Sequence, residues 1–403
     1  MRPFEPLETA SGYVLGEDRD APPLPHETRS VRACLEEAVA RALARPPCVV
    51  AFSGGRDSSA VLALATAVAR RRGLDLPVPL TFRFPHAPET AEDAWQERVV
   101  SHLGLDEWER IELHDELDAL GPVATAALRR HGLYWPANAH FLVPALRAAR
   151  GGSLLTGAGG DQLLDPGRHA RLARVLARRT PPEPRDLLRV AVAASPVRVR
   201  TAVRARRDPP RLVCPWLRPA AEAAVRAALA RDAATEPVRR GPWARWVWRA
   251  RPTQAGLRIM SLLAEDEDAT LVHPFFEPAV FAAFGAETRR DPPASRTVAM
   301  RRLVGDLLPA DVCERRSKAV FTTPFWNVHA AAYAATLSPE DVDSDLVDGD
   351  GAVRIWSQPE SSEVPLFRSL TLLQATWLRN VSVERVKERV RGGDADAPVP
   401  RAS

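Results

Sequence analysis

A glycine-rich segment near the start of the chain carries residue types that bind phosphate. It reads FSGGRDSS over residues 52–59 and lies between a short apolar run and an amphipathic stretch. Glycines let backbone N–H groups approach phosphate oxygens, serine hydroxyls add donors, and a following helix directs the positive end of its dipole at the anion. The predicted anion-binding residues are Ser53, Gly54, Gly55, Asp57 and Ser58. Asp57 is also a predicted Mg²⁺ ligand, because hard oxygen ligands suit that ion. A tight turn merely capped by Asp or Ser is the alternative.

A second glycine-rich segment, LLTGAGGDQ, covers residues 154–162. Its spacing does not match the dinucleotide-binding pattern Gly-x-Gly-x-x-Gly, so by itself it is weak evidence for a site. If both segments follow parallel strands, they face the same crevice beyond the carboxyl ends of those strands. We therefore predict that Thr156 and Gly157 line the phosphate site and that Asp161 is the second carboxylate for Mg²⁺.

Lysine is almost absent from the chain: 53 of the 55 basic residues are arginine, and only Lys318 and Lys387 remain. Lys318 lies in the segment RRSKAVFTTP, residues 315–324, where the usage of the chain would predict arginine. A compact ammonium differs from a planar guanidinium, so a retained lysine indicates a point charge placed on developing charge in a transition state. We predict that Lys318 is catalytic; a surface lysine without a function is the alternative. Lys387 is predicted to be a solvated residue of a C-terminal helix.

Several classes of protein are excluded by what the chain lacks. Neither lysine has the neighbours that the Walker phosphate loop or a protein kinase requires. The four cysteines lie far apart without a C-x-x-C pair, which argues against a zinc knuckle, a redox pair or a disulfide scaffold. The N-terminus lacks the apolar region of a signal peptide, and no run of about 18 apolar residues occurs. A cytoplasmic protein is therefore expected.

The motifs are positioned by an alternation of short apolar runs and amphipathic stretches. Strands are predicted over residues 48–52, 78–84, 108–113 and 153–156, and helices over 30–44, 58–72, 91–103 and 116–131. Such alternation is typical of an α/β fold with a doubly wound parallel sheet. Beyond about residue 168 helical periodicity dominates, which predicts a largely helical second half.

The organisation of the chain follows from these elements and from its charge. We predict a lead-in segment over residues 1–30, a main domain over 31–390 and a disordered tail over 391–403. The main domain would consist of a sheet core, 46–165, and a helical part, 166–390. Residues 168–251 contain 21 arginines against six acids, so this stretch is about +15 and the remainder about −11. The asymmetry indicates an acidic partner or a basic channel, or else helices with solvated arginine-rich faces.

The sequence Ser-Gly-Gly-x-Asp-Ser of residues 53–58 resembles the pyrophosphate-binding loop of the ATP pyrophosphatase superfamily. Together with residues 154–162 it is similar to the asparagine synthetase branch, and this resemblance covers about residues 30–330. It implies an adenine nucleotide α-hydrolase-like fold, ATP and Mg²⁺ as ligands, and adenylation of a carboxylate with release of pyrophosphate. The family pattern Arg-x-Lys-x-x-Phe, met here around Lys318, implies that this lysine stabilises the acyl-adenylate reaction.

Two positions depart from the family pattern. Ala158 stands where ammonia-using members carry Glu, which argues against ammonia as the amine. Thr270 stands where the family has Glu four residues before Pro274, so the base that activates the amine is unassigned. The N-terminal glutaminase domain of asparagine synthetase, with its cysteine at position 2, is expected to be lacking, because that position is Arg2. The amine is then free ammonia or one carried by the substrate.

Within this branch the chain is most similar to the lasso-peptide macrolactam synthetases. The resemblance rests on the loop Gly-x-Gly-Gly-Asp, on His-Pro-Phe at residues 273–275 and on RTVAMR at residues 296–301. It implies that an Asp or Glu side chain of a precursor peptide is adenylated and joined to the N-terminal amine of the same peptide. It also implies a leader-binding protein and a leader peptidase as partners. No membrane partner is expected, and nucleic acid is not the expected partner.

Other functions remain open at this stage. A β-lactam synthetase-like ligase shares every motif, and ammonia-dependent asparagine synthesis differs only in the amine. A tRNA-modifying pyrophosphatase would account for the arginines and tryptophans of residues 240–249, but the paired cysteines of the sulfur-transferring members are missing. An inactive scaffold that binds nucleotide or peptide is opposed by the intact Asp57, Asp161 and Lys318. The acidic segment 341–345 is interpreted as a solvated loop, because Leu346 stands where a calcium loop requires Gly.

Overall fold

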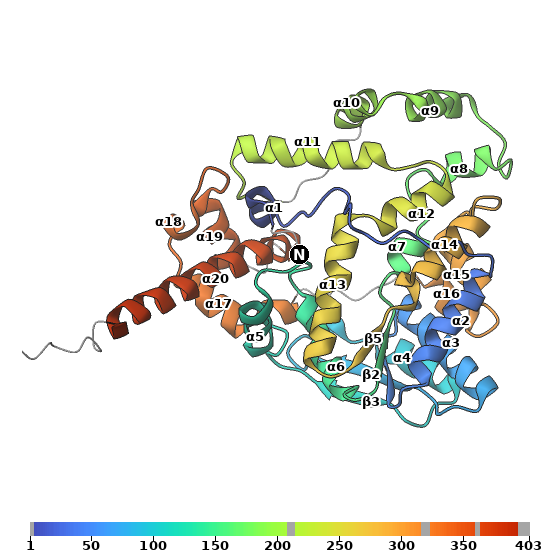
Figure 1. Cartoon of the computed structure of the whole chain (residues 1–403), viewed down its shortest axis with the longest axis horizontal. Helices are drawn as coiled ribbons and strands as arrows, with labels where there is room; N and C mark the ends of the chain where they lie inside the picture. The colour runs from blue at the N-terminus through green and yellow to red at the C-terminus, as the bar shows by residue number, and fades with distance from the viewer. Residues whose placement is uncertain (1–3, 208–213, 316–322, 359–362, 394–403) are drawn as a thin grey trace, which may run out of the picture.

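The core of the protein is a parallel sheet of five strands in the order β3-β2-β1-β4-β5 (Figure 1). The computed structural model describes residues 4–207, 214–315, 323–358 and 363–393. The strands are β1 (Cys48–Ala51), β2 (Val78–Arg83), β3 (Glu109–Glu112), β4 (Ser153–Thr156) and β5 (Thr270–Val272). From β1 the chain builds outward to β3 and then returns to the other side of β1. The predicted α/β fold with a doubly wound parallel sheet is confirmed.

The strand register places the two glycine-rich segments at the same edge of the sheet. Ala51 at the end of β1 pairs with Thr156 at the end of β4, and Val272 at the end of β5 pairs with Leu155. The order of the strands reverses between β1 and β4. Ligands of such sheets bind beyond the carboxyl ends of the strands at this point of reversal.

Twenty α-helices and four short 3₁₀-helices cover the sheet and build the second half of the described chain. In the first half they are α1 (Pro6–Ser11), α2 (Val31–Leu43), α3 (Arg56–Arg72), η1 (Pro88–Thr90), α4 (Asp93–Leu103), α5 (Pro122–His131), η2 (Ala139–Leu142), α6 (Val143–Ala148) and α7 (Gly160–Leu164). In the second half they are α8 (Ala170–Leu176), α9 (Pro184–Ala194), α10 (Val197–Arg207), α11 (Pro219–Thr235), α12 (Arg240–Trp248), α13 (Arg251–Asp266), η3 (Pro274–Phe276), α14 (Pro278–Glu287), α15 (Arg296–Val304), α16 (Ala310–Glu314), η4 (Thr323–Phe325), α17 (Val328–Ala335), α18 (Pro339–Val342), α19 (Gly349–Ser357) and α20 (Glu363–Gly393).

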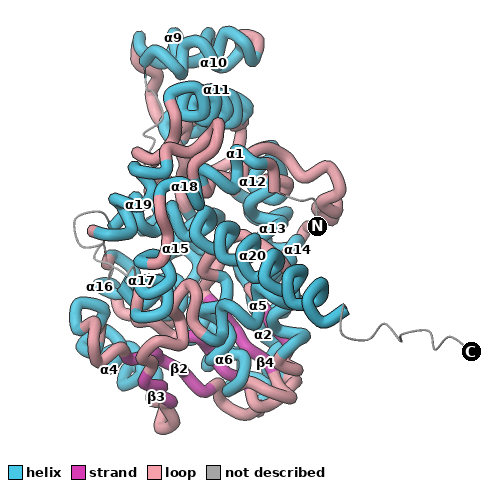
Figure 2. The backbone as a smooth tube through the Cα atoms, turned by 90° about the vertical axis from the view of Figure 1, so that its left-hand side faces the viewer, coloured by secondary structure: helices cyan, strands magenta, loops and turns pink. Residues whose placement is uncertain are grey.

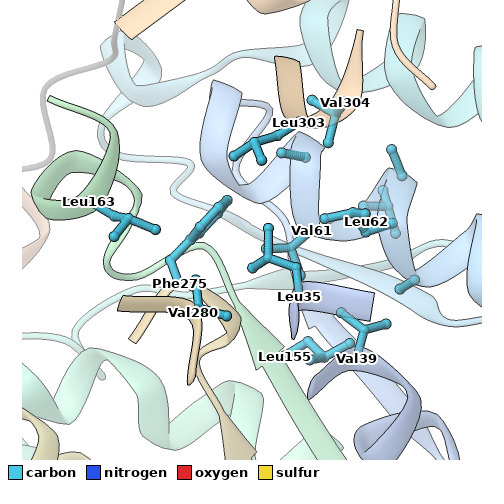
Figure 3. Packing of buried hydrophobic residues seen from close by; sticks show 14 of the residues in the cluster. Leu35, Val39, Val61, Leu62, Leu155, Leu163, Phe275, Val280, Leu303 and Val304 are labelled. Carbon is cyan, nitrogen blue, oxygen red and sulfur yellow. The ribbon is translucent and has the colours of Figure 1, made fainter. Parts of the chain in front are cut away.

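Both faces of the central strands β1 and β4 are largely buried, whereas three of the four residues of the edge strand β3 are exposed. Successive side chains of a strand point to opposite faces, so Val50 joins one hydrophobic cluster and Val49 the other. The first cluster includes residues of α2, α3, α14 and α15, and Figure 3 shows part of it around Val61 and Phe275. The second includes residues of α5, α6, α13 and α20. Figure 2 shows the strands lying among the helices, as is usual for a parallel sheet.

One strand was missed by the sequence analysis, and one helix begins later than predicted. β5 was not predicted, because three residues are too few to show a period and its only ladder partner, β4, lies more than a hundred positions earlier in the chain. The helix predicted from residue 116 begins at Pro122, because residues 116–121 form turns around the buried Asp118. Its carboxylate accepts the N–H of Leu120 at 2.9 Å.

The N-terminal segment packs against the helical half rather than against the sheet. α1 contacts α11 and α20, and Trp216 donates its indole N–H to the Ala10 carbonyl at 2.7 Å. Residues 12–15 form no strand; the neighbouring Glu17 makes an isolated bridge to Ala250. Of the predicted tail, residues 391–393 belong to α20 and residues 394–403 lie outside the described residues.

The described helices include none with the length and apolarity needed to cross a bilayer. All four cysteines are buried and form no disulfide with one another.

Candidate active site

The two glycine-rich loops are in direct contact at the carboxyl edge of the sheet. Gly157, just beyond β4, lies so close to the first loop that a Cβ atom there would be 2.6 Å from the Ser58 backbone nitrogen. A Cβ atom on Gly160 would overlap the carboxylate of Asp57. Glycine is therefore required at both positions by the close approach of the two loops.

The first loop leads directly into the N-terminus of α3. Gly54 has a φ of +80°, which favours glycine, and Gly55 is the N-cap of the helix. The hydroxyls of Ser53 and Ser58 lie 3.2 Å apart, and Ser58 donates to the Gly55 carbonyl at 3.1 Å. Two hydroxyls thus meet at a helix terminus that carries a positive partial charge, which is the arrangement an anion requires.

Asp57 and Asp161 converge on one side chain, the guanidinium of Arg296 at the start of α15. Arg296 forms ion pairs with both carboxylates. Burial raises the pKa of the Asp57 carboxyl above its usual value, while the Arg296 guanidinium opposes that rise. The Asp57 Oδ1 atom is buried and has no hydrogen-bond partner among the described residues.

These two carboxylates fit a Mg²⁺ ion. Mg²⁺ in nucleotide sites is usually held by one or two protein carboxylates, with substrate phosphates and water completing the shell. The buried, unpartnered oxygen of Asp57 is a ligand atom of the required kind. A cage of three or more His, Cys, Asp or Glu ligands does not occur in the described part of the chain, so the phosphates of a nucleotide would have to contribute.

The end of β4 is tied to the end of β5 through Thr156 and His273. Thr156 Oγ1 and His273 Nδ1 share a hydrogen bond of 2.6 Å, and Thr156 Oγ1 also accepts the N–H of Ala158 at 3.2 Å. Burial lowers the pKa of His273 to about 4, so its imidazole is neutral at neutral pH. His273 Nε2 is buried without a partner among the described residues.

A comparison with known proteins identifies the family of this chain. A family model described as asparagine synthase matches residues 30–345 of the chain. The chain belongs to the asparagine synthase family. The match includes both loops, β5 and Lys318. Members are ATP-dependent ligases, so this chain is an ATP-binding ligase of the asparagine synthase type. No curated protein matches the chain.

Arg315 holds the first loop in place through its backbone. Its guanidinium donates to the Gly54 carbonyl at 2.7 Å, forms an ion pair with Glu92 and lies over the ring of Trp95. Gln96, on α4, donates to the Ser53 carbonyl at 3.2 Å. Two carbonyls of the loop are thereby held by side chains, while the N–H groups of Ser53 and Gly55 donate to the hydroxyl oxygens of Ser58 and Ser53 at 3.3 Å each.

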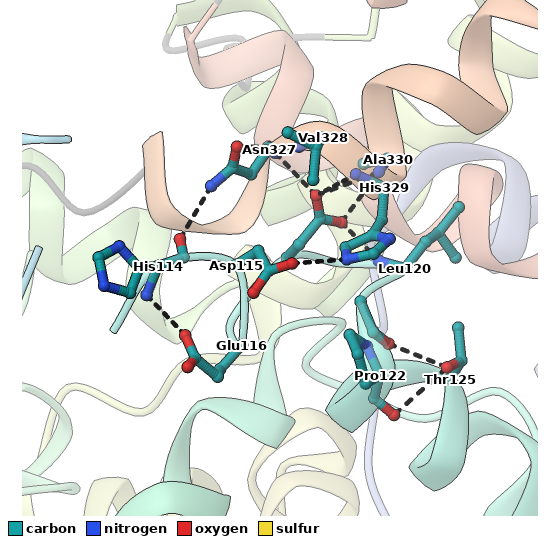
Figure 4. A network of polar contacts seen from close by, with 12 residues as sticks. His114, Asp115, Glu116, Leu120, Pro122, Thr125, Asn327, Val328, His329 and Ala330 are labelled. Atoms are coloured by element: carbon teal, nitrogen blue, oxygen red, sulfur yellow. Dashed lines mark hydrogen bonds and ion pairs between the residues drawn. The ribbon is translucent and has the colours of Figure 1, made fainter. Parts of the chain in front are cut away.

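Lys318 lies outside the described residues, but both flanks of its segment are anchored. Arg315 precedes the segment and holds the first loop, and Thr323 follows it and donates to Glu89 at 2.9 Å. The start of α17 is then fixed by the buried carboxylate of Asp118, which accepts the N–H groups of Asn327, His329 and Ala330 at 3.0 Å each (Figure 4). The chain therefore enters residues 316–322 beside the first loop and leaves them beside η1.

The structure brings together most of the residues that the sequence predicted. The predicted residues that meet at the carboxyl edge are Ser53, Gly54, Gly55, Asp57, Ser58, Thr156, Gly157 and Asp161. Thr270, where the family has Glu, lies at the other end of β5 and accepts a hydrogen bond from Arg45 at 2.9 Å.

Sequence analysis did not assign roles to Arg296, Arg315, Gln96 or His273. Arg296 and His273 lie in segments that resemble the family, but their contacts join positions more than a hundred residues apart.

Proposed function

We propose that this asparagine synthase family member closes the macrolactam ring of a lasso peptide. The observation that carries the proposal is the pair of loops that unite Asp57 and Asp161 next to Ala158. The methyl group of Ala158 is partly buried and packs against the hydrophobic core. A site of this kind has the groups that bind ATP, but no carboxylate at position 158 for ammonia, so the amine would come from the substrate.

In the first step a side-chain carboxylate of the peptide attacks the α-phosphorus of ATP. A carboxyl oxygen forms a bond to that phosphorus, and the bond from the α-phosphorus to the oxygen that bridges to the β-phosphate breaks. Pyrophosphate leaves and an acyl adenylate remains. The protein accelerates such a step mainly through positioning and electrostatic stabilisation of the leaving group.

The residues of the first loop would hold the leaving pyrophosphate. The Ser53 and Ser58 hydroxyls and the N-terminus of α3 would bind this anion. Asp57 and Asp161 would hold Mg²⁺, which supplies charge neutralisation on the phosphates when bound. Arg296 Nε is buried without a partner among the described residues, so this side chain retains a donor besides the two that pair with the carboxylates.

In the second step the N-terminal amine of the peptide attacks the carbonyl carbon of the adenylate. The new C–N bond forms, the bond from the carbonyl carbon to the phosphate oxygen breaks, and AMP leaves. The amine loses a proton, which passes to solvent; Thr270 does not accept it, because Thr270 lies at the amino end of β5. Lys318 would stabilise the negative charge that develops in both steps.

The substrate would be a precursor peptide held folded so that its two ends meet. Related systems imply a leader-binding protein and a leader peptidase as partners, and we propose the same for this chain, in the cytoplasm. Ammonia-dependent asparagine synthesis, a β-lactam synthetase-like reaction and an inactive scaffold are the outcomes against which the proposal is tested.

The test is pyrophosphate release from Mg·ATP with candidate linear core peptides, with the mass of the product recorded. Peptide-dependent AMP and pyrophosphate with a product lighter by one water supports ring closure. Asp57→Ala and Lys318→Ala should abolish it, whereas Asp75→Ala, at an exposed carboxylate beyond α3, should not. Turnover with only ammonia and aspartate, or none with any substrate, contradicts the proposal.

A further inference from the structure

The exposed large apolar residues of the protein are concentrated in one region. Of the eight such residues in the described part of the chain, six lie between residues 176 and 199. They are Leu176, Leu187, Leu188, Val190, Val197 and Val199. Five of them belong to α9 and α10, residues 184–207, which we call the α9–α10 arm. The arm forms the outermost layer at one end of the molecule, over α11 (Figures 1 and 2).

The first helix of the arm presents an apolar stripe to solvent. Leu187, Val190, Ala191 and Ala194 follow the i, i+3, i+4, i+7 spacing that places side chains on one face of a helix. All four are exposed; Leu187 retains 72% and the neighbouring Leu188 53% of its accessible surface. α10 lies against α11, but α9 contacts chiefly α8 and α10. The described residues therefore leave the stripe uncovered, although an amphipathic helix normally buries it.

The arm also carries a surplus of positive charge. Residues 184–207 contain seven arginines and one acid, Asp186. That acid is buried and already paired, at 3.0 Å with Arg171 and at 3.2 Å with Arg189. Arg198 and Arg206 are exposed. The arm thus combines an uncovered apolar surface with a surplus of cationic side chains, and exposed apolar patches with polar borders mark interaction sites.

We infer that the α9–α10 arm binds an acidic amphipathic helix of a partner protein. The stripe of α9 would cover the apolar face of that helix, and the arginines would lie against its carboxylates. A second copy of this chain is disfavoured, because an isologous contact would bring the arginine-rich surfaces together. A membrane surface is disfavoured too, because interfacial helices anchor with Trp or Phe and residues 184–207 contain no aromatic residue.

The inference does not depend on the proposed ring closure, and its test uses binding alone. The probe is a fluorescein-labelled peptide of about 18 residues, long enough to form a helix, with leucine at helical spacing and glutamate at the other positions. We expect the full chain to bind it with a dissociation constant in the micromolar range. A peptide of the same composition in scrambled order should bind at least about tenfold more weakly. Binding should weaken as salt rises, because exposed charges are screened.

The variant with Leu187→Asp and Leu188→Asp should lose at least about tenfold in affinity. Its matched control is Leu76→Asp, at a leucine that is 42% exposed and lies beyond α3, away from the arm. The control should bind as the unaltered chain does. Circular dichroism and the melting temperature of both variants check that they are folded.

Three results would overturn the inference. The first is equal binding of the designed and scrambled peptides. The second concerns vesicles of phosphatidylcholine and phosphatidylglycerol. If the unaltered chain floats with them, the double variant does not, and the designed peptide binds no better than the scrambled one, the arm binds a membrane. The third is a dimer of the unaltered chain, measured by light scattering, that becomes a monomer in the double variant. In that case the stripe binds a second copy.

Discussion

The nucleotide loops and the α9–α10 arm use arginine in opposite ways. At the loops, Arg296 is paired with two carboxylates, and Arg315 is buried against the Gly54 carbonyl and Glu92. On the arm, Arg198 and Arg206 of α10 are exposed, and α9 carries the uncovered apolar stripe. In a chain with 53 arginines, the number of arginines in a segment therefore says little about function. The burial of each guanidinium and the group that it contacts distinguish the candidate active site from the proposed docking surface.

The nucleotide loops and the α9–α10 arm also differ in how closely they pack against the rest of the protein. The loops meet at glycines where no side chain fits, so the geometry of the site is fixed by backbone contact. The arm is held to the rest of the protein mainly through α10 and leaves α9 largely uncovered. Substitutions should therefore act on chemistry at the loops and on binding at the arm.

The largest effect should follow from Gly160→Ala. The added methyl group would occupy the space of the Asp57 carboxylate, so this metal ligand must move. A displacement of about 1 Å in a reacting site costs on the order of a hundredfold in rate, and we expect at least that loss in pyrophosphate release. The matched control is Gly241→Ala in α12, where the nearest atom would be 3.5 Å away and turnover should not change. Full activity of the Gly160 variant would show that the two loops can separate without cost.

Two histidines should make stability depend on pH. Burial lowers the pKa of His140 and of His273 to about 4, whereas an unfolded histidine titrates near 6.5. Between pH 4 and pH 6.5 the unfolded state therefore binds more protons than the folded state. The contribution of these histidines to the free energy of unfolding is complete above about pH 6.5 and is lost as the pH falls toward 4. Each histidine should contribute up to about 3 kcal/mol, measured as the free energy of unfolding in urea at pH 7, 5.5 and 4.5.

The control for this prediction is a pair of variants in which each histidine is replaced, with the free energy of unfolding measured against pH. His140 accepts a hydrogen bond from the Tyr134 hydroxyl and donates to the Leu117 carbonyl, so His140→Gln retains polar partners. His273→Gln can likewise remain bonded to Thr156. Each replacement should flatten the slope. An unchanged slope in both variants would mean that other groups control the acid sensitivity.

A smaller effect should follow from Arg296→Gln, compared with Arg198→Gln on the arm. Removing the Arg296 guanidinium leaves Asp57 and Asp161 near each other without their cation. We expect a loss of about 2 kcal/mol in the free energy of unfolding without Mg²⁺, since breaking a partly buried pair leaves an uncompensated charge. Added Mg²⁺ should restore more stability to this variant than to the unaltered chain. Arg198→Gln should change neither quantity, and equal behaviour of the two variants would contradict the difference between the regions.

Much of the site could be predicted from the sequence because its parts are local. The loop FSGGRDSS lies within eight positions, and glycines, hydroxyls and a carboxylate at a strand-to-helix junction have a direct physical meaning. Four of the five strands showed as short apolar runs. The charge clamp of Arg296 could not be predicted, because it joins α15 to loops 135 and 239 positions earlier. β5 was not predicted for the same reason, because its pairing with β4 joins positions far apart in the sequence.

The smallest effect should come from the two exposed leucines of α9 when no partner is present. Leu187→Gln with Leu188→Gln replaces side chains that are 72% and 53% exposed, so little apolar burial is lost. We expect the free energy of unfolding and the rate of pyrophosphate release to stay within error of the unaltered chain, because exposed substitutions usually change stability by less than about 0.5 kcal/mol. Leu76→Gln provides the comparison at an exposed leucine outside the arm. A loss above about 1 kcal/mol in the double variant alone would mean that the stripe packs within this chain, and then no surface would be left for a partner helix.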